Sequence, residues 1–205
     1  SCEYDNPKGV PISAVILGGR RSRLIPLITE AFNWEHGVFM GARMGSETTA
    51  AAAGKVGVLR RDPMAMLPFC GYNMGNYFRH WISMGRLLSR PPRIYSLNAF
   101  RVSETGEFLW PGFGENIRII KWIVDRVNGR AAARETPLGW VPDLNSFPLE
   151  GLSIPRSNMQ KLFEVDSGEW SSELEEIKEF LRQFGPHMPY EIWQNYNTMA
   201  ARLKS

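Results

Sequence analysis

The sequence predicts an α/β domain built on a mixed β-sheet, with helices packed on the sheet and a helical C-terminal tail. Short apolar runs that end at glycines alternate with longer segments in which apolar residues recur at helical spacing, and no internal repeat interrupts this alternation. The 205 residues suffice for one domain that buries roughly 70% of its unfolded surface. We expect residues 1–150 to form the α/β part and residues 151–205 to form a tail that packs on the same domain.

The composition is that of an ordinary globular protein, with 43% hydrophobic and 22% charged residues. No apolar run approaches the roughly 20 residues that span a bilayer, so no membrane segment is expected. The first residues show neither the basic start nor the apolar stretch of a signal peptide. Cys2 and Cys70 are too few for a disulfide framework, which favours a reducing interior.

Charge is distributed unevenly along the chain. Residues 1–163 carry 20 basic and 13 acidic side chains, residues 164–205 carry 4 and 8, and 18 of the 24 basic residues are arginines. The guanidinium fork grips phosphate or carboxylate groups at two points, which favours a ligand that carries phosphate. An ordinary solvated face is the alternative.

The first predicted strand is the apolar run ISAVIL at residues 12–17, which stops at a pair of glycines. Arg20, Arg21 and Arg23 follow directly. Open α/β sheets bind ligands at the carboxyl ends of their strands, so these arginines are candidate ligand contacts. A surface loop with ordinary charges is the alternative.

Residues 36–42, HGVFMGA, are predicted to form a second strand, and the segment MGSETTAAAAGKVG that follows is the least globular part of the chain. Its glycine–lysine pair makes no Walker A motif, because the glycine spacing is wrong and Val56 follows Lys55. Small side chains between glycines suit a mobile surface loop, and such loops are often lids. A short alanine-rich helix from Glu47 to Ala53 is the alternative.

Residues 74–87 are predicted to form an amphipathic helix that packs on the sheet, because large apolar side chains recur there at helical spacing, namely Met74, Tyr77, Phe78, Trp81 and Met84. The run RPPR at residues 90–93 breaks the chain, and residues 94–101 are predicted to be extended. Residues 103–106, SETG, then turn the chain back into FLW at residues 108–110, which is typical of a hairpin.

The stretch FLWPGFGEN at residues 108–116 places three aromatic side chains in one tight loop before a predicted helix. That helix begins near Glu115 and ends at an Asn-Gly stop signal, and its expected apolar face consists of Ile117, Ile120, Val124 and Val127. Glycines let a ligand approach the backbone, the free N–H groups of a first helical turn attract polar edges, and aromatic rings can sandwich a planar base. The loop is therefore a candidate base slot, and aromatic side chains that cap a core are the alternative.

The C-terminal tail is predicted to be helical and structural. Asp166 and Glu169 resemble a capping pair ahead of one helix, and Pro189 opens a last helix. Neither helix carries a catalytic pattern. The histidines lie too far apart in the sequence to predict a metal site from this chain alone; they are His36, His80 and His187. These patterns together predict an α/β nucleotide-binding domain.

Five unusual segments follow one another along the chain: PKGVPISAVILGGRR, EAFNWEHGVFMGARMGSE, RRDPMAMLPFCGYN, FLWPGFGEN and ETPLGWVP. In this order they closely resemble the C-terminal part of the GTP-dependent phosphoenolpyruvate carboxykinases. The resemblance is strong from Pro7 to Pro142 and loose in the tail. It implies a gluconeogenic enzyme that converts oxaloacetate and GTP to phosphoenolpyruvate, GDP and carbon dioxide with Mn²⁺ and Mg²⁺. It further implies a cytoplasmic or mitochondrial monomer with no nucleic-acid or membrane partner.

The resemblance also implies which residues bind the nucleotide. Phe100 and Phe113 would lie on opposite faces of the guanine, with Phe108 beside it. Asn116 would meet the edge of the base, and Arg20 matches the family's catalytic arginine at the nucleotide phosphates. The complete set implied to bind GTP is Arg20, Phe100, Phe108, Phe113, Gly114, Glu115 and Asn116.

A loop matches the family's Ω-loop lid, which closes over the bound substrates, and its residues here are Thr48, Thr49, Ala50, Ala51, Ala52, Ala53, Gly54 and Lys55. Two positions depart from the family pattern. Many members carry Glu at the position of Ala53 and Trp at the position of Ala99. The first departure puts the latching of the lid in doubt, and the second thins one wall of the base slot.

The family's phosphate-binding loop, its metal ligands and its oxaloacetate-binding arginines belong to a part of the enzyme that precedes Ser1. The chain is therefore expected to be a fragment that is inactive alone and meets oxaloacetate or phosphoenolpyruvate only with the missing N-terminal part. The alternative is a stand-alone, non-catalytic nucleotide-binding or interaction domain derived from the family, which Ala53 and Ala99 favour.

Overall fold

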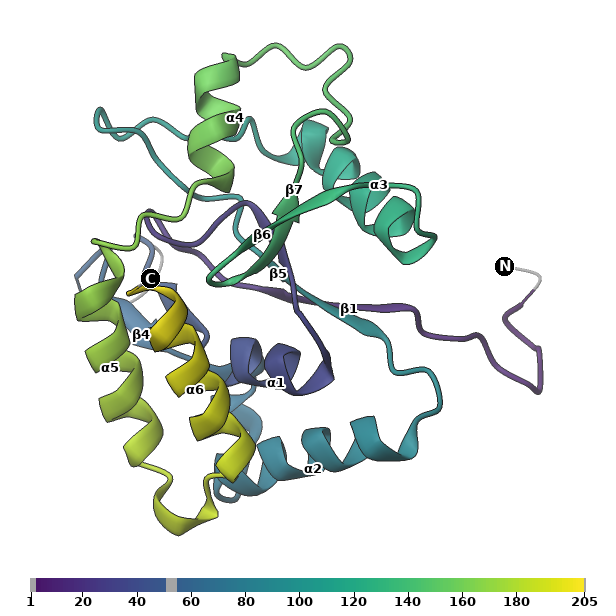
Figure 1. Cartoon of the computed structure of the whole chain (residues 1–205), viewed down its shortest axis with the longest axis vertical. Coiled ribbons are helices and arrows are strands. Elements are labelled where there is room, and N and C mark those ends of the chain that lie inside the picture. Colours follow the sequence, from purple (N-terminus) through teal and green to yellow (C-terminus); the bar gives the residue numbers. More distant parts are fainter. Residues whose placement is uncertain (1–2, 51–54, 205) are drawn as a thin grey trace.

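The computed structural model describes residues 3–50 and 55–204, and it shows a mixed five-stranded sheet with helices packed on it (Figure 1). The α/β class predicted from the sequence is confirmed. The strands lie in the spatial order β1 (Ala14–Gly18), β5 (Arg93–Leu97), β2 (Ile28–Glu30), β7 (Gly139–Pro142) and β6 (Ala133–Thr136). β1 runs parallel to β5, and the other neighbouring pairs of this sheet are antiparallel.

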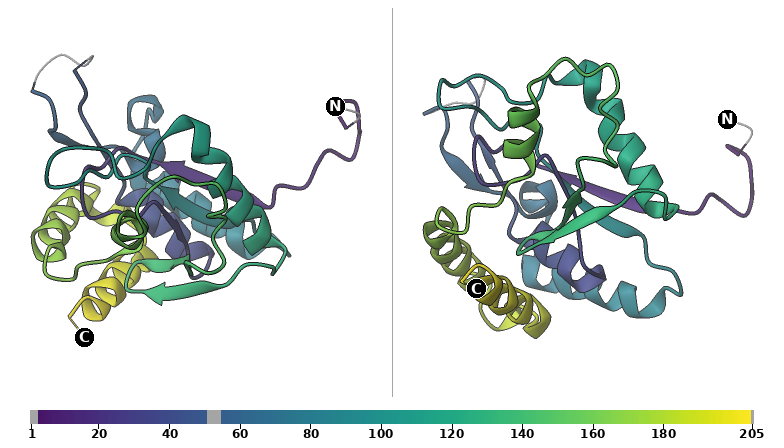
Figure 2. Two further views of the ribbon diagram at one scale, coloured as in Figure 1. Left: turned by 90° about the horizontal axis from the view of Figure 1, so that it is seen from above. Right: turned by 45° about the horizontal axis from the view of Figure 1, so that its top comes forward.

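Two helical layers cover the sheet (Figures 1 and 2). One layer consists of α3 (Asn116–Val127) and α4 (Arg156–Phe163), and the other of α1 (Trp34–Ala42), α2 (Met74–Leu87), α5 (Trp170–Arg182) and α6 (Tyr190–Arg202). Successive side chains of a strand point to opposite faces, and β5 shows the consequence. Ile94 packs in the cluster with α1 and α2, whereas Tyr95 meets Trp122 of α3 edge to face at a ring distance of 6.1 Å.

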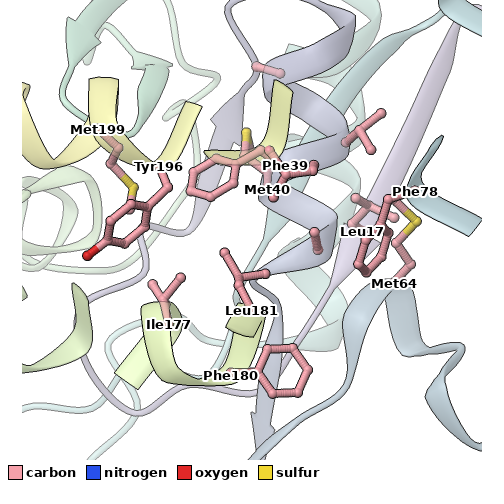
Figure 3. Close-up of a cluster of buried hydrophobic side chains, with 14 of the residues drawn as sticks. Leu17, Phe39, Met40, Met64, Phe78, Ile177, Phe180, Leu181, Tyr196 and Met199 are labelled. Carbon is pink, nitrogen blue, oxygen red and sulfur yellow. The ribbon is translucent and has the colours of Figure 1, made fainter. Parts of the chain in front are cut away.

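The larger core lies between the sheet and the four helices of the second layer. Figure 3 shows Phe39 and Met40 of α1 beside Tyr196 and Met199 of α6, with side chains of α5 below them. The predicted tail helices are confirmed by this packing, since Ile177 and its neighbours at helical spacing are buried. The other buried apolar residues of the α5 face and its extension are Trp170, Leu174, Phe180, Leu181 and Phe184.

The predicted strand at residues 36–42 is wrong, because this segment lies within α1. The side-chain oxygen of Asn33 accepts the backbone N–H of His36 and caps the helix. All seven residues are buried, so the segment shows no polar face from which a helical period could be recognised. Gly37 permits the close packing, since a Cβ there would lie 2.5 Å from a methyl carbon of Ile94.

Helix α3 has the predicted extent but not the predicted face. Ile117, Ile120 and Val124 are exposed and Val127 is half-buried. The helix instead packs through Ile119, Trp122 and Ile123. Its sequence, NIRIIKWIVDRV, is apolar on two sides, so spacing alone could not decide which side faces the sheet.

Several elements escaped the sequence analysis. These are β2, α4, the hairpin of β6 and β7, and a second small sheet formed by β3 (Gly45–Glu47) and β4 (Leu59–Arg61). The predicted capping pair of α5 is also wrong, because Glu169 makes no capping hydrogen bond. Asp166 instead accepts the N–H of Gly168 at 2.8 Å, within the turn that precedes the helix.

Candidate functional site

The candidate site begins where the two parallel strands of the sheet end. The N–H of Gly19, just after β1, donates to the carbonyl of Leu97 at the end of β5. Arg20 and Phe100 therefore leave the sheet at the same edge, which is where α/β sheets commonly bind ligands. The guanidinium carbon of Arg20 lies 3.9 Å from the centroid of the Phe100 ring.

A buried asparagine that the sequence analysis missed holds these two segments together. Asn98 donates its amide N–H groups to the carbonyls of Arg21 and Ile25, and its Oδ1 accepts the backbone N–H groups of Arg21 and Phe100. All of these bonds are 3.3 Å or shorter. A lone Asn after an apolar strand is the only signal that the sequence offers for this role. Asn98 fixes the arginine loop to the segment that carries Phe100.

The loop at residues 108–116 divides its aromatic side chains between the core and the surface. Trp110 is 1% exposed, whereas Phe108 is 60% and Phe113 is 94% exposed. The core interpretation of this loop is therefore confirmed for Trp110 alone, and the base slot stays a prediction. Trp110 packs edge to face on Phe147 at 6.2 Å and belongs to the core. Burial in the core does not account for the two phenylalanines.

Glycine shapes this loop. Gly112 has a φ of 95°, a backbone conformation that residues with a side chain rarely adopt. A 3₁₀ turn, Phe113–Glu115, leads from Gly112 into α3. No side chain caps the start of α3, so the N–H groups of its first turn have no side-chain acceptor there. Gly114 is exposed at the crest of the turn. The N–H groups of Glu115 and Asn116 donate to the carbonyls of Gly112 and Phe113 within the turn. The loop thus presents Phe113 at the start of a helix that no side chain caps.

The polar residues of the loop point in different directions. Glu115 pairs with Arg118 one turn along α3, at 2.5 Å. Asn116 accepts the indole N–H of Trp110 through its Oδ1 at 2.9 Å. Phe108 meets Phe100 edge to face at 6.3 Å, and the predicted hairpin that joins them has one bridge, between Val102 and Phe108, rather than a ladder.

The loop after β1 carries Arg20, Arg21 and Arg23. Of these three, only Arg20 contacts one of the phenylalanine rings of the candidate site, that of Phe100. Arg21 is buried and donates two hydrogen bonds to Glu173 of α5, at 2.9 and 2.7 Å, and Arg61 of β4 donates a third at 2.8 Å. Burial by itself would raise the pKa of Glu173, but the hydrogen bonds and charges of Arg21 and Arg61 outweigh it and lower that pKa to about 2. Arg23 pairs with Glu169 at the surface. Arg21 and Arg23 thus anchor the loop to the tail.

The side chains of Phe100, Phe108 and Phe113 form an open aromatic surface rather than an enclosed cavity. A hollow of about 450 Å³ lies on the neighbouring side of the loop and is lined by Ser22, Arg101, Lys161 and other polar residues. None of the three phenylalanines lines this hollow. A ligand on the aromatic side chains would consequently be held by stacking and by the edges of the loop.

The segment that resembles a lid is joined to the same group. Arg20 binds β3 at two points. Its backbone N–H donates to Ser46 Oγ at 2.9 Å, and its carbonyl accepts the N–H of Glu47 at 2.8 Å. Thr48 closes the base of the loop, since its hydroxyl accepts the N–H of Val58 and donates to the carbonyl of Lys55. Thr49 is half-buried and Ala50 is exposed, while Ala51, Ala52, Ala53 and Gly54 lie outside the described residues.

Within residues 3–50 and 55–204, no three His, Cys, Asp or Glu side chains gather in a way that could hold a metal ion. In the same ranges, no helix has the length and apolar character to cross a membrane.

Comparisons with known proteins identify relatives of the whole chain. Residues 1–202 match the family model described as the phosphoenolpyruvate carboxykinase C-terminal P-loop domain. Curated proteins named phosphoenolpyruvate carboxykinase [GTP] are 53% identical in Anaeromyxobacter dehalogenans, 49% in Thermoplasma volcanium and 48% in Chlamydia pneumoniae. Each match covers 98% of this chain but only 34%, 33% and 34% of the relative. The chain spans about a third of the length of these relatives.

Proposed function

The chain belongs to the phosphoenolpyruvate carboxykinase C-terminal P-loop domain family, and on that premise we propose that it supplies the guanine-nucleotide-binding surface of a GTP-dependent carboxykinase. The reaction would convert oxaloacetate and GTP to phosphoenolpyruvate, GDP and carbon dioxide, in gluconeogenesis. The single observation that carries the proposal is the 94% exposure of Phe113 beside the uncapped start of α3. A non-catalytic domain is not favoured, because the relatives named above all carry the name of the enzyme.

The base would stack between Phe100 and Phe113. Stacking on aromatic rings contributes roughly 1 to 3 kcal/mol per base in nucleic-acid binders, and an exposed ring is already positioned for it. Phe108 supports Phe100 from its edge, and Gly114 leaves room for close approach to the backbone. Asn116 would meet the polar edge of the base, while Glu115 stays paired with Arg118 and contributes through its backbone.

The phosphates would lie toward Arg20. Its guanidinium has no carboxylate within ion-pair distance among the described residues, whereas Arg21 and Arg23 are both paired. A guanidinium binds phosphate oxygens through charge-assisted hydrogen bonds, which are the strong ones. Because the backbone of Arg20 is bonded to β3, the phosphate contact and the base of the proposed lid would form one connected unit.

The lid would extend from Thr48 to Lys55 and close over the bound substrates. Its base is pinned by the two hydrogen bonds of the Thr48 hydroxyl, so closure would bend the loop above that point. Oxaloacetate or phosphoenolpyruvate, Mn²⁺ and Mg²⁺ would be held with the parts of the enzyme that the relatives carry beyond this match. The described residues offer no cluster of ligands for either ion, so we propose no metal-binding role for them. We also propose a cytoplasmic monomer.

Hydrogen–deuterium exchange with saturating GDP tests where the nucleotide binds. The proposal predicts slower exchange at residues 99–116 and around Arg20, where base and phosphates would lie. The hairpin of β6 and β7 is the internal reference and should be unchanged. Protection confined to residues 161–169, which line the polar hollow, or no protection at all, would place the nucleotide elsewhere.

A further inference from the structure

The hydrogen bond between Trp110 and Asn116 determines which atoms of the Asn116 amide face outward. An indole N–H can only donate, so the atom that accepts it must be the amide oxygen, Oδ1. The amide NH₂ group then has to point away from Trp110. This chemistry removes the usual ambiguity between the oxygen and nitrogen of an asparagine side chain.

The indole is held firmly enough to impose that orientation. Trp110 is buried and packs edge to face on Phe147, within the cluster that α3 and α4 form with the sheet. Asn116 is the first residue of α3, so its backbone is also fixed. Both partners of the bond therefore belong to ordered elements, and the half-buried amide has one preferred orientation.

An outward NH₂ group discriminates between purines. Guanine presents the acceptor O6 at the position where adenine presents the donor N6–H₂. A fixed N–H donor can hydrogen-bond to O6 of guanine, but it would face the N6–H₂ donor of adenine and leave both donors unpaired. Polar groups left unpaired at a binding site discriminate strongly against the wrong ligand. We propose that Trp110 is a positioning residue for purine selection, because it turns the Asn116 amide donor toward O6. This inference rests on the guanine site proposed above.

The test compares Trp110→Phe with Trp122→Phe, each measured by equilibrium titration with GDP, ADP and inosine diphosphate. Trp122 is a matched control, because it is buried in the same cluster and its indole N–H has no partner among the described residues. Both variants lose similar bulk, but only the first loses the hydrogen bond. We expect Trp110→Phe to reduce the ratio of GDP to ADP affinity by at least about fivefold, while Trp122→Phe leaves it within about twofold.

Inosine diphosphate retains O6 of guanine and lacks the 2-amino group, so its affinity shows which of these two groups the Asn116 amide recognises. It should follow GDP through both variants. Trp110 also closes the loop that carries Phe113, so a displaced loop would weaken all three nucleotides alike and leave their ratios unchanged. An unchanged GDP to ADP ratio in folded Trp110→Phe overturns the inference.

Asn116→Asp decides the question if Trp110→Phe does not fold. One carboxylate oxygen would still accept from Trp110, and the other would put an acceptor where the NH₂ group stood. The inference predicts a shift of at least about tenfold toward ADP, and tighter GDP binding by this variant contradicts it. If the unaltered protein binds GDP no better than ADP, the guanine site itself is wrong. If it prefers GDP and folded Trp110→Phe keeps that preference while Asn116→Asp loses it, only the role of Trp110 is wrong.

Discussion

The guanidinium of Arg20 stacks on the ring of Phe100, with 3.9 Å between the guanidinium carbon and the ring centroid. This contact joins the proposed phosphate end of the site to its proposed base platform. The two residues come from the ends of neighbouring parallel strands, and Asn98 fixes both segments. At the proposed site, this arrangement would let one side chain contact two parts of a nucleotide.

Arg20→Ala should separate these two contributions. Loss of a charge-assisted phosphate contact is expected to weaken GDP binding by about tenfold or more, whereas guanosine, which has no phosphate, should lose less than about fivefold through the missing cation–π contact. Titration calorimetry with both ligands measures the difference. Arg23→Ala, which removes a paired surface arginine of the same loop, is the control and should change neither affinity. Equal losses for GDP and guanosine would exclude the phosphate role.

The proposed lid should be open to protease and protected by substrates. Lys55 is exposed, and few large side chains surround it, so trypsin should cut after it early in the free protein. Saturating GDP with phosphoenolpyruvate should slow that cut several-fold if the loop closes. Cleavage after Lys8, which is exposed in the segment before β1, reports any general effect of the ligands on trypsin. Equal rates at Lys55 with and without substrates would contradict closure.

His36 should make the protein sensitive to mild acid. Burial, followed by the charges of Arg43 and Arg202, lowers the pKa of His36 from 6.5 to about 3. The unfolded chain therefore takes up the proton first, so stability is complete above about pH 6.5 and falls as the pH drops toward 3. The expected slope is roughly 1.4 kcal/mol per pH unit in that window.

His36→Gln should flatten this slope between pH 6.5 and 4.5, measured by urea unfolding at several pH values. Its absolute stability at pH 7 will also change, because the Nδ1 of His36 accepts the N–H of Phe32. His80→Gln, at an exposed position, is the control and should keep the slope of the unaltered protein. An identical slope in His36→Gln would show that another group titrates.

The carboxylate of Glu173 should be worth far more to stability than that of its neighbour on α5. Glu173→Gln leaves the buried Arg21 and Arg61 without their shared counter-charge, and breaking a buried pair costs roughly 3 to 5 kcal/mol. Glu176→Gln removes only an exposed partner of Arg61 and should cost about 1 kcal/mol or less. Urea unfolding at pH 7 measures both, and similar losses would mean that the buried network is not stabilising.

Sequence patterns correctly predicted the elements that have a distinct apolar face or apolar run. The strand that ends at Gly18, the helix from Met74 to Leu87 and the tail helices each combine a clear apolar face or run with a stop signal, and the structure confirms them. The strand prediction for residues 36–42 was wrong because this helix is buried on every side and has no polar face. Strands of three residues, such as β2, are too short to show alternation.

The candidate site was partly predictable. The composition of the arginine loop and of residues 108–116 marked both segments as candidate binding sites. The spacing of their residues does not show which side chains are buried and which are exposed. Trp110 is in the core while Phe113 is exposed, and Arg21 is bound to Glu173 while Arg20 stacks on Phe100. Asn98 was missed because its partners are backbone groups far away in the sequence.

The exposed ring of Phe113 would bind the guanine base, and titration of Phe113→Ala with GDP beside thermal melts tests this proposal most directly. Because the ring is 94% exposed, the melting temperature should hardly move, with a change in stability of about 0.5 kcal/mol or less. Affinity for GDP should fall by roughly 1 to 3 kcal/mol, the worth of one stacking contact. Phe147→Ala, in the buried cluster behind the loop, should instead lower the melting temperature strongly. GDP affinity that is unchanged in folded Phe113→Ala would contradict the account.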